Sequence, residues 1–219
     1  MEPKLPLRRI VLPGVNVFVI QGEGAYALID TGRKISRKLL LQKLADLGVE
    51  PSMLSLIILT HTHFDHAGGV RMMKKLSGAK VVVHRSEAVN LRRGYTPIPR
   101  GTRRKSKIIS VLGRILFPWL GFFPRAQADI VVDKELDLHK MGFPAKIYHV
   151  GGHTKGSMMV VLDDGGAVVG DNLLGVNGPK RFPPFANDVE GVKRCWDLLD
   201  ELGVESMWPA HGSEVKSSY

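Results

Sequence analysis

The segment His61-Thr62-His63-Phe64-Asp65-His66 places three imidazoles and one carboxylate within six residues. It begins one residue after the apolar run 54–59, which is typical of a buried strand, so the cluster is expected where a strand ends and a loop begins. His61 and His63 alternate along an extended segment and can point to one side. Asp65 and His66 come next, at an expected helix start. Binding sites are commonly built at such strand ends, which favours a metal or catalytic site over a polar loop.

Three further residues with metal-binding side chains follow expected strands later in the chain. They are His153, Asp171 and His211, and each is flanked by glycine or another small residue. Small neighbours let the backbone pass close to a metal and leave the coordinating side chain accessible. The candidate ligand set therefore contains seven residues, which are His61, His63, Asp65, His66, His153, Asp171 and His211.

Imidazole and carboxylate ligands without a thiolate suit zinc, and also iron or manganese. Seven ligands are too many for one tetrahedral ion. They are the right number for two ions about 3.5–4 Å apart that share a bridging carboxylate. The ligand set therefore predicts a binuclear centre with two Zn²⁺, with iron or manganese as alternatives.

The first half of the chain must supply the elements that position the first cluster. Residues 15–20 and 25–30 predict a β-hairpin. A helix is expected between Ser36 and Gly48, and a further helix from about Asp65 to Leu76. Residues 79–84 predict another buried strand.

Strand patterns return at residue 130 and carry the other three candidate ligands. Strands are expected at 130–132, 146–150, 158–162, 167–169 and 206–208, with 163–166 as a hairpin turn. Asn187 or Asp188 is expected to cap a helix that ends at Gly203. Strands followed by a helix thus occur twice, which predicts two βα halves packed face to face.

These motifs resemble those of the metallo-β-lactamase superfamily. The run from Thr60 to His66 matches the family's T-H-x-H-x-D-H signature, and Gly152-His153-Thr154, Gly170-Asp171 and His211-Gly212 resemble its later motifs. Asp30-Thr31-Gly32 fits as well. The resemblance implies an α/β fold, a four-layer αββα sandwich, as a single domain over residues 1–219.

The resemblance also implies roles for the seven residues. His61, His63 and His153 would hold one metal, Asp65, His66 and His211 the other, and Asp171 would bridge them. The implied activity is that of a binuclear hydrolase, in which a metal-bridging hydroxide attacks a small ester-like substrate such as a thioester or lactone. Relatives of this type include hydroxyacylglutathione hydrolases and acyl-homoserine lactonases. Asp65 is expected to act catalytically as well, by orienting the nucleophile.

Two other functions remain open at this point. The first is a metal-dependent phosphodiesterase or ribonuclease, which the basic segment of the chain favours. Residues 85–114 hold nine Lys or Arg and one acid, a net +8 out of +10 for all 219 residues. The second is a non-catalytic metal-bound sensor, which would be favoured by loss of ligands, and none is lost.

Residues 86–128 combine basic and apolar residues and are expected to be an insertion with one or two short helices. Three interpretations are open: a solvated loop, a lid over the metal site, or a nucleic-acid or membrane surface through 85–125. A small-molecule substrate is the expected partner.

Several single residues complete the expectations. Cys195 is the one cysteine, so no intrachain disulfide forms, and with no signal peptide or transmembrane segment recognised, a cytoplasmic location is expected. Cys195 itself is expected in a core, and His84 and His139 in structural or surface positions. Asp30 either orients a metal-binding imidazole or caps its own turn, and His149 is either structural or supports the site.

Overall fold

The computed structural model describes residues 7–176 and 181–217. Within these residues the strands form two six-stranded sheets. The first follows chain order, and its members are β1 (Leu7–Leu12), β2 (Val15–Gln21), β3 (Tyr26–Ile29), β4 (Leu54–Ile58), β5 (Lys80–His84) and β6 (Ile130–Val132). The second has the order β12 (Val215–Lys216), β11 (Ser206–Pro209), β10 (Gly166–Gly170), β9 (Met158–Leu162), β8 (Ala145–His149) and β7 (Glu135–Asp137).

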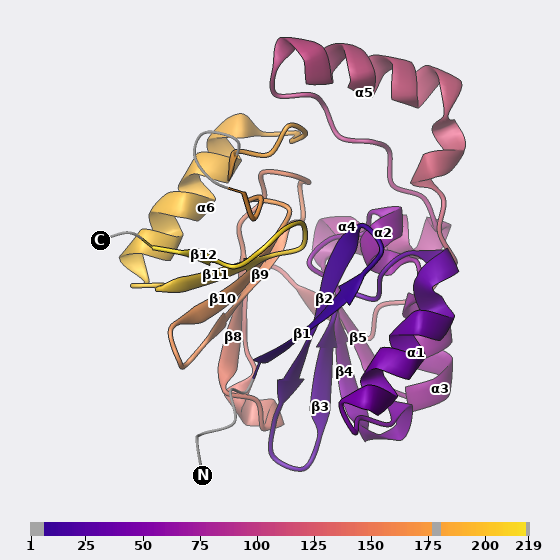
Figure 1. Ribbon diagram of the computed structural model, residues 1–219, viewed down its shortest axis with the longest axis vertical. Coiled ribbons are helices and arrows are strands. Elements are labelled where there is room, and N and C mark those ends of the chain that lie inside the picture. Colours follow the sequence, from indigo (N-terminus) through magenta and orange to yellow (C-terminus); the bar gives the residue numbers. More distant parts are fainter. Residues whose placement is uncertain (1–6, 177–180, 218–219) are drawn as a thin grey trace.

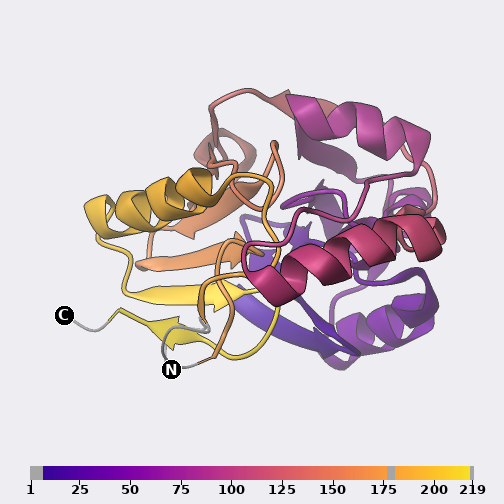
Figure 2. The ribbon, with the colours of Figure 1, turned by 90° about the horizontal axis from the view of Figure 1, so that it is seen from above.

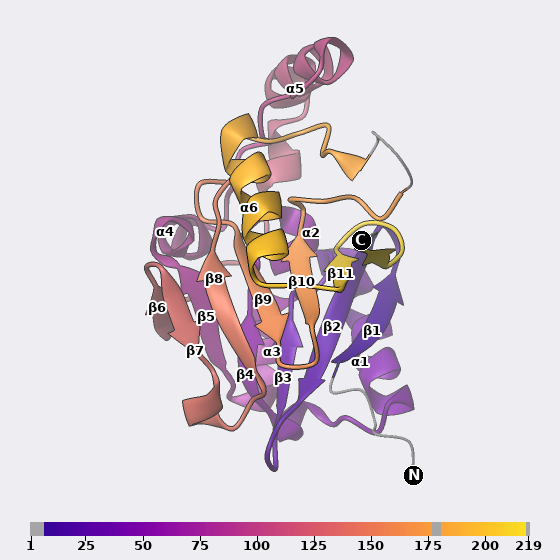
Figure 3. The same cartoon turned by 90° about the vertical axis from the view of Figure 1, so that its left-hand side faces the viewer.

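Helices cover the outer face of each sheet (Figures 1 and 3). On the first sheet lie α1 (Arg37–Asp46), α3 (Val70–Ser77) and α4 (Arg85–Arg93), and on the second lies α6 (Val189–Glu201). The expected four-layer αββα sandwich is confirmed. None of the helices in the described part of the chain is both long and apolar enough to cross a membrane.

Alternating side chains divide the core into layers. On β2, Val17 and Val19 belong to the cluster under the outer helices, whereas Phe18 and Ile20 belong to the cluster between the two sheets. A third cluster, which includes Cys195 and Leu199 of α6, lies between the second sheet and that helix. Strand alternation therefore gives the first sheet two buried faces, as layered α/β proteins require.

The strands that lead to the candidate ligands end at one edge of the sandwich. β8, β10 and β11 run in the same direction in the second sheet, because β10 pairs in parallel with β11 and antiparallel with β9, which is antiparallel to β8. The end of β4 meets this edge, since the amide of Met158 donates to the carbonyl of Thr60. Loops from both sheets thus converge there.

The expected helix from Asp65 to Leu76 is two helices, α2 (Phe64–Ala67) and α3. Gly68 and Gly69 separate them and pass against the backbone that follows β3. A Cβ on Gly69 would lie 2.5 Å from the carbonyl oxygen of Thr31. The break therefore lets the first ligand cluster approach the Asp30-Thr31-Gly32 turn closely.

Residues 86–128 include all of α4 except its first residue, and then a longer segment that lies outside the sandwich. α4 packs on β5 and β6, and its Leu91 is fully buried. The chain then leaves the sandwich, forms α5 (Arg104–Leu116) and the short helix η3 (Pro118–Gly121), and returns to β6. Figure 1 shows α5 as the outermost element at the end of the molecule where the ligand loops lie, and Figure 2 shows it crossing above them.

Candidate metal centre

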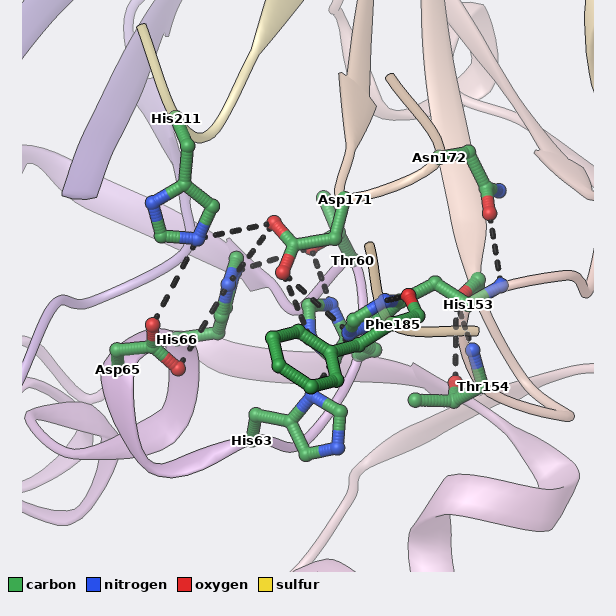
Figure 4. Close-up of polar contacts among 12 residues, drawn as sticks. Thr60, His63, Asp65, His66, His153, Thr154, Asp171, Asn172, Phe185 and His211 are labelled. Carbon is green, nitrogen blue, oxygen red and sulfur yellow. Dashed lines mark hydrogen bonds and ion pairs between the residues drawn. The ribbon is translucent and has the colours of Figure 1, made fainter. Parts of the chain in front are cut away.

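The structure brings all seven candidate ligands together. Their coordinating atoms form two groups, each with its atoms within 4.8 Å of one another, and the groups are His61, His63, His153 and Asp171 on one side and Asp65, His66 and His211 on the other. Figure 4 labels six of them, all except His61, and shows these six side chains converging from loops of both sheets. The grouping coincides with the assignment that the sequence resemblance implies, while metal binding by each residue stays a prediction.

Asp171 lies between the two groups. Its Oδ2 is 3.3 Å from Nε2 of His153 and 3.9 Å from Nε2 of His61. Its Oδ1 is 3.3 Å from Nε2 of His211 and 3.4 Å from Nε2 of His66. Each oxygen therefore faces one group of imidazoles, which is the arrangement that a bridging carboxylate needs.

Most of the imidazoles are held by one ring nitrogen and present the other to the centre. Nδ1 of His153 donates to the carbonyl of Phe185 (2.8 Å), and Nδ1 of His211 donates to the carbonyl of Gly14 (2.7 Å). His66 contacts Asp30 through Nδ1 at 2.8 Å. A hydrogen bond at Nδ1 fixes the tautomer and leaves the Nε2 lone pair for a metal.

His63 has the opposite orientation. Its Nε2 lies 3.3 Å from the carbonyl oxygen of Pro97, and its Nδ1 lies 2.9 Å from Nε2 of His153. His61 has Thr60 Oγ1 at 3.2 Å from Nδ1. Each of the five rings thus has one nitrogen with a partner outside the centre and one directed into it.

Burial and nearby charges lower the pKa of some of the imidazoles and raise that of others. Burial lowers the pKa of His63 to about 3, helped by nearby His153, and it also lowers the pKa values of His61 and His153. These rings are neutral at physiological pH, the state that coordinates a metal. On the other side, burial opposes charging of His66, but Asp30 and Asp171 raise its pKa well above the usual value.

The donor set fits divalent metal ions. Nε2 of His61, Nε2 of His66 and Oδ1 of Asp171 are buried polar atoms without a hydrogen-bond partner among the described residues. Such atoms are costly to bury unless something binds them. They all point into the same centre, and the nitrogen and oxygen donors there suit a divalent ion such as zinc.

Asp30 supports both ligand-bearing segments from the first sheet. Its carboxylate is fully buried, accepts hydrogen bonds from the amide (2.9 Å) and hydroxyl (2.8 Å) of Thr60, and contacts His66. Of the two roles that the sequence left open for Asp30, the structure shows the contact with a site imidazole. Its φ of +61° lies in the left-handed region, which non-glycine residues adopt only where their surroundings hold them.

Three supporting residues lie outside the sequence motifs. Buried Glu87 on α4 accepts hydrogen bonds from the Thr62 hydroxyl and from the amides of Thr62 and Gly156 (both 3.3 Å), so it joins the loops that carry His63 and His153. Asn172 accepts from the His153 amide at 2.8 Å. Asn16 donates to the carbonyls of Pro209 and Gly212, on both sides of His211.

Two of these residues have a signal in the sequence. Glu87 is the single acid in the basic stretch 85–114, and Asn16 is a lone polar residue in the apolar run 15–20. Neither pattern says which loop the side chain reaches, because both contacts depend on packing between distant elements.

The remaining candidates lie away from the centre. The rings of His84 and His149 stack at 3.8 Å, and Nε2 of His149 lies 2.9 Å from the Lys155 carbonyl oxygen, so His149 has a structural position. His139 is on the surface between Asp137 and Asp163. Cys195 is buried in the core as predicted, and burial raises the pKa of its thiol to about 12.

A cavity of about 630 Å³ opens onto the candidate ligands beneath α5. Apart from those ligands and Thr96, its walls are apolar or glycine. The apolar walls come from α2, α5, η3 and the loops around them, and include Phe64, Ile98, Ile109, Leu112, Leu174 and Phe185. The cavity suits a small substrate that presents a polar group to the centre and an apolar group to α5.

Comparison with protein families finds one model that spans nearly the whole chain. The model of the metallo-beta-lactamase superfamily matches residues 11–211. The match includes both the first ligand cluster and His211.

Individual relatives are distant. A probable metallo-hydrolase of Methanocaldococcus jannaschii is 23% identical over 201 residues, which cover 90% of this chain and 87% of that protein. A hydroxyacylglutathione hydrolase of Pelagibacter ubique is 23% identical over 74% of this chain, and the chain spans 56% of that enzyme.

Solved structures show the same fold. A subclass B3 metallo-β-lactamase of Bradyrhizobium japonicum aligns with a TM-score of 0.68 and 22% identity, over 94% of this chain and 75% of that one. A metallo-β-lactamase of Legionella gormanii aligns with a TM-score of 0.67 and 18% identity, over 94% of this chain and 76% of that one.

Proposed function

Since the chain belongs to the metallo-β-lactamase superfamily and is a metal-dependent hydrolase, we propose that it hydrolyses a small thioester or lactone at a binuclear zinc centre. The observation that carries the proposal is the position of Asp171 between two groups of ligands, below an apolar cavity. Two bound Zn²⁺ would lower the pKa of a coordinated water and polarise the substrate carbonyl.

The chain's own residues would hold the two ions and orient the nucleophile. His61, His63 and His153 would hold one ion, and Asp65, His66 and His211 the other, with Asp171 shared. Asp65 is partly accessible, with Oδ2 3.6 Å from Nε2 of His211, and can accept a proton from a water in the cavity. Asp65 is therefore proposed to position the attacking water as well as to bind metal.

The apolar cavity walls would bind the acyl or ring part of the substrate. Ile109 and Leu112 approach from α5, and Phe185 approaches from the loop that also holds His153. No Lys or Arg is among the described lining residues, which supports an uncharged acyl group over a phosphodiester. Hydrolysis of an apolar ester releases a carboxylate, which such walls bind poorly, so product release is favoured.

The test combines metal analysis with a substrate series. Protein purified without added metal is analysed for elements, then assayed with acyl thioesters and acyl-substituted lactones of increasing chain length and with bis(p-nitrophenyl) phosphate. We expect two zinc ions per chain and a kcat/KM for thioesters or lactones that rises with acyl length. Each added methylene buried should raise kcat/KM by about threefold to fourfold until the cavity is full.

Two variants make the test specific. Asp171→Ala should reduce metal content and abolish hydrolysis, whereas Leu112→Gln should keep the metal and lose the preference for long acyl groups. Turnover of the phosphodiester alone would contradict the proposal, and so would full metal loading without hydrolysis of any ester.

A further inference from the structure

The large apolar side chains of α5 are exposed, whereas in a helix that packs on a protein core they would be buried. The face toward the protein is small and polar, since Ser106 and Ser110 are buried and the Ser110 hydroxyl donates to the carbonyl of Pro99. The large apolar side chains Ile108, Val111 and Ile115 are 62%, 56% and 68% exposed. With 100° between successive residues these three lie within one narrow stripe, which we call the outer stripe.

The outer stripe is distinct from the cavity wall. Ile109 and Leu112 project from a neighbouring face of α5 and line the cavity, whereas none of the outer-stripe residues does. Exposed apolar surface continues past the end of α5 through Trp119 and Phe122, which are 59% and 62% exposed. An exposed apolar surface of this kind on one outlying element marks an interaction site.

Basic residues surround the outer stripe. Between residues 88 and 128 the chain has nine Lys or Arg and no Asp or Glu. Arg104, Lys105 and Lys107 are exposed in the first turn of α5 and form no ion pair within the described residues. Positive charges at the positive end of a helix dipole are unfavourable on their own, so an anionic surface would offset them.

These features identify the partner by its chemistry. A second copy of the chain would bring one basic surface against another, with no acid in residues 88–128 to pair with it. A nucleic acid would leave the aliphatic outer stripe unused. A bilayer that contains anionic lipids provides both an apolar interior and a negative surface.

We propose that α5 docks on anionic lipid bilayers, with Ile108, Val111 and Ile115 in the acyl region and Arg104, Lys105 and Lys107 among the headgroups. Figures 1 and 3 show that α5 forms the end of the molecule, so a flat surface can reach it without meeting the sandwich. Long aromatic and basic side chains at such a position suit the boundary between lipid and water.

Docking would also place the cavity beside the bilayer. Ile109 and Leu112 connect the lipid-facing side of α5 to the cavity above the ligands. If the proposed esterase function holds, an apolar substrate could pass from the membrane to the centre along α5 without crossing water. This last point depends on the proposed function, whereas docking itself does not.

The test is sedimentation of the full chain with vesicles of phosphatidylcholine, alone or with part replaced by phosphatidylglycerol. We expect binding only to the anionic vesicles, weakening as salt is raised. The triple variant Ile108→Gln, Val111→Gln and Ile115→Gln should bind at least about tenfold more weakly, because it loses the buried apolar area. Neutralising Arg104, Lys105 and Lys107 to Gln should weaken binding by about fivefold per charge.

Matched controls place the same changes elsewhere. Met53→Gln, Leu76→Gln and Met141→Gln replace three exposed apolar residues before β4, at the end of α3 and before β8, and Lys75→Gln, Lys80→Gln and Lys140→Gln remove three exposed charges from the same parts of the chain. Both control sets should bind vesicles as the wild type does. Equal losses in test and control variants would overturn the proposal, as would absence of binding to anionic vesicles.

Two further readouts separate the possible failures. Light scattering tests self-association: a dimer that the outer-stripe variant converts to monomers, without vesicle binding, would overturn the proposal in favour of a second copy. Hydrolysis of a short water-soluble ester should be unchanged by the outer-stripe variant, which shows that it is folded. Vesicle binding without hydrolysis of any ester would leave docking intact and contradict only the proposed function.

Discussion

Asp30 provides the most local test of the centre, because three hydrogen-bond donors converge on its carboxylate: the Thr60 amide, the Thr60 hydroxyl and Nδ1 of His66. In Asp30→Asn, the side-chain NH2 group, which cannot accept a hydrogen bond, would face at least one of these donors. We expect metal affinity to fall about 10–100-fold, as for other residues that orient a metal-binding imidazole. Competition with a zinc-binding dye measures this, with the exposed Asp200→Asn as the control. Equal affinities of the two variants would contradict the role given to Asp30.

Glu87 tests whether a residue outside every motif positions the ligands. Glu87→Gln keeps the size of the side chain but presents an amide where two oxygens now accept hydrogen bonds from Thr62 and Gly156. We expect the free energy of unfolding to fall by about 1–3 kcal/mol, because a buried donor loses its acceptor. Urea unfolding measures this loss.

Activity distinguishes positioning by Glu87 from a purely structural role. A shift of the loops that carry His63 and His153 should lower kcat with little change in KM. Glu201→Gln, on the exposed end of α6, is the matched control. A stability loss with kcat unchanged would limit Glu87 to a structural role.

At the scale of elements, the carboxylate of Asp129 connects α3, β5 and the start of β6 on the first sheet. Asp129, just before β6, accepts from Lys74 Nζ of α3 at 2.6 Å and from the Val81 amide of β5 at 2.8 Å. Burial alone would raise its pKa, but the hydrogen bonds from Lys74 and Val81 hold the pKa of this carboxyl below its ordinary value of 3.8. A lowered folded-state pKa stabilises the fold above that value, and this contribution is lost as pH falls through the folded-state pKa.

Asp129→Asn should therefore reduce the free energy of unfolding by about 1 kcal/mol at neutral pH. As pH falls from 3.8 through the lowered folded-state pKa, the difference from wild type should shrink toward zero, because the folded wild-type carboxyl becomes protonated as well. Urea unfolding across this pH range measures the difference, with Asp197→Asn as the exposed control. A difference that stays constant down to the lowest pH would contradict the assignment.

The helices and strands also show where sequence patterns are sufficient to predict secondary structure. The hairpin of β2 and β3, the strands that lead to the ligands and helix α6 follow from apolar runs between turn residues and from helical periodicity, and they are observed. β1, β7 and β12 were not expected. β7 and β12 have three and two residues, too few for a pattern, and β1 has two arginines among its first three residues.

At the scale of the whole molecule, the four layers and the ligand set could be anticipated because the ligands lie in short motifs at strand ends. The residues that support the ligand loops could not be anticipated, since the contacts of Glu87 and Asn16 depend on how distant elements pack. The orientation of α5 could not be predicted either, because the composition of residues 86–128 left three interpretations open: a solvated loop, a lid, or a nucleic-acid or membrane surface. Whether that segment is a separate insertion in a single domain stays a prediction.

Removing the metal should affect the stability of the entire fold, because the ligand loops come from both sheets. Dialysis against a strong chelator should lower Tm, and two equivalents of Zn²⁺ should restore it. Binding at a free metal concentration about a thousandfold above Kd contributes about 4 kcal/mol. Calorimetry measures the shift, and Asp171→Ala should show a much smaller response to zinc. Equal melting with and without chelator would contradict a metal that links the two sheets.

The hydrogen bonds from Asn16 to the carbonyls on both sides of His211 join residues 193 and 196 positions apart in the sequence. During synthesis the first ligand group is complete once Asp171 has emerged, whereas the second waits for His211 and for its loop to reach back to β2. Closing so long a segment is slow compared with forming local helices and hairpins. A nascent chain would therefore pass through a stage that is able to hold one ion before it can hold two, and the supply of the second ion becomes part of the last step of folding.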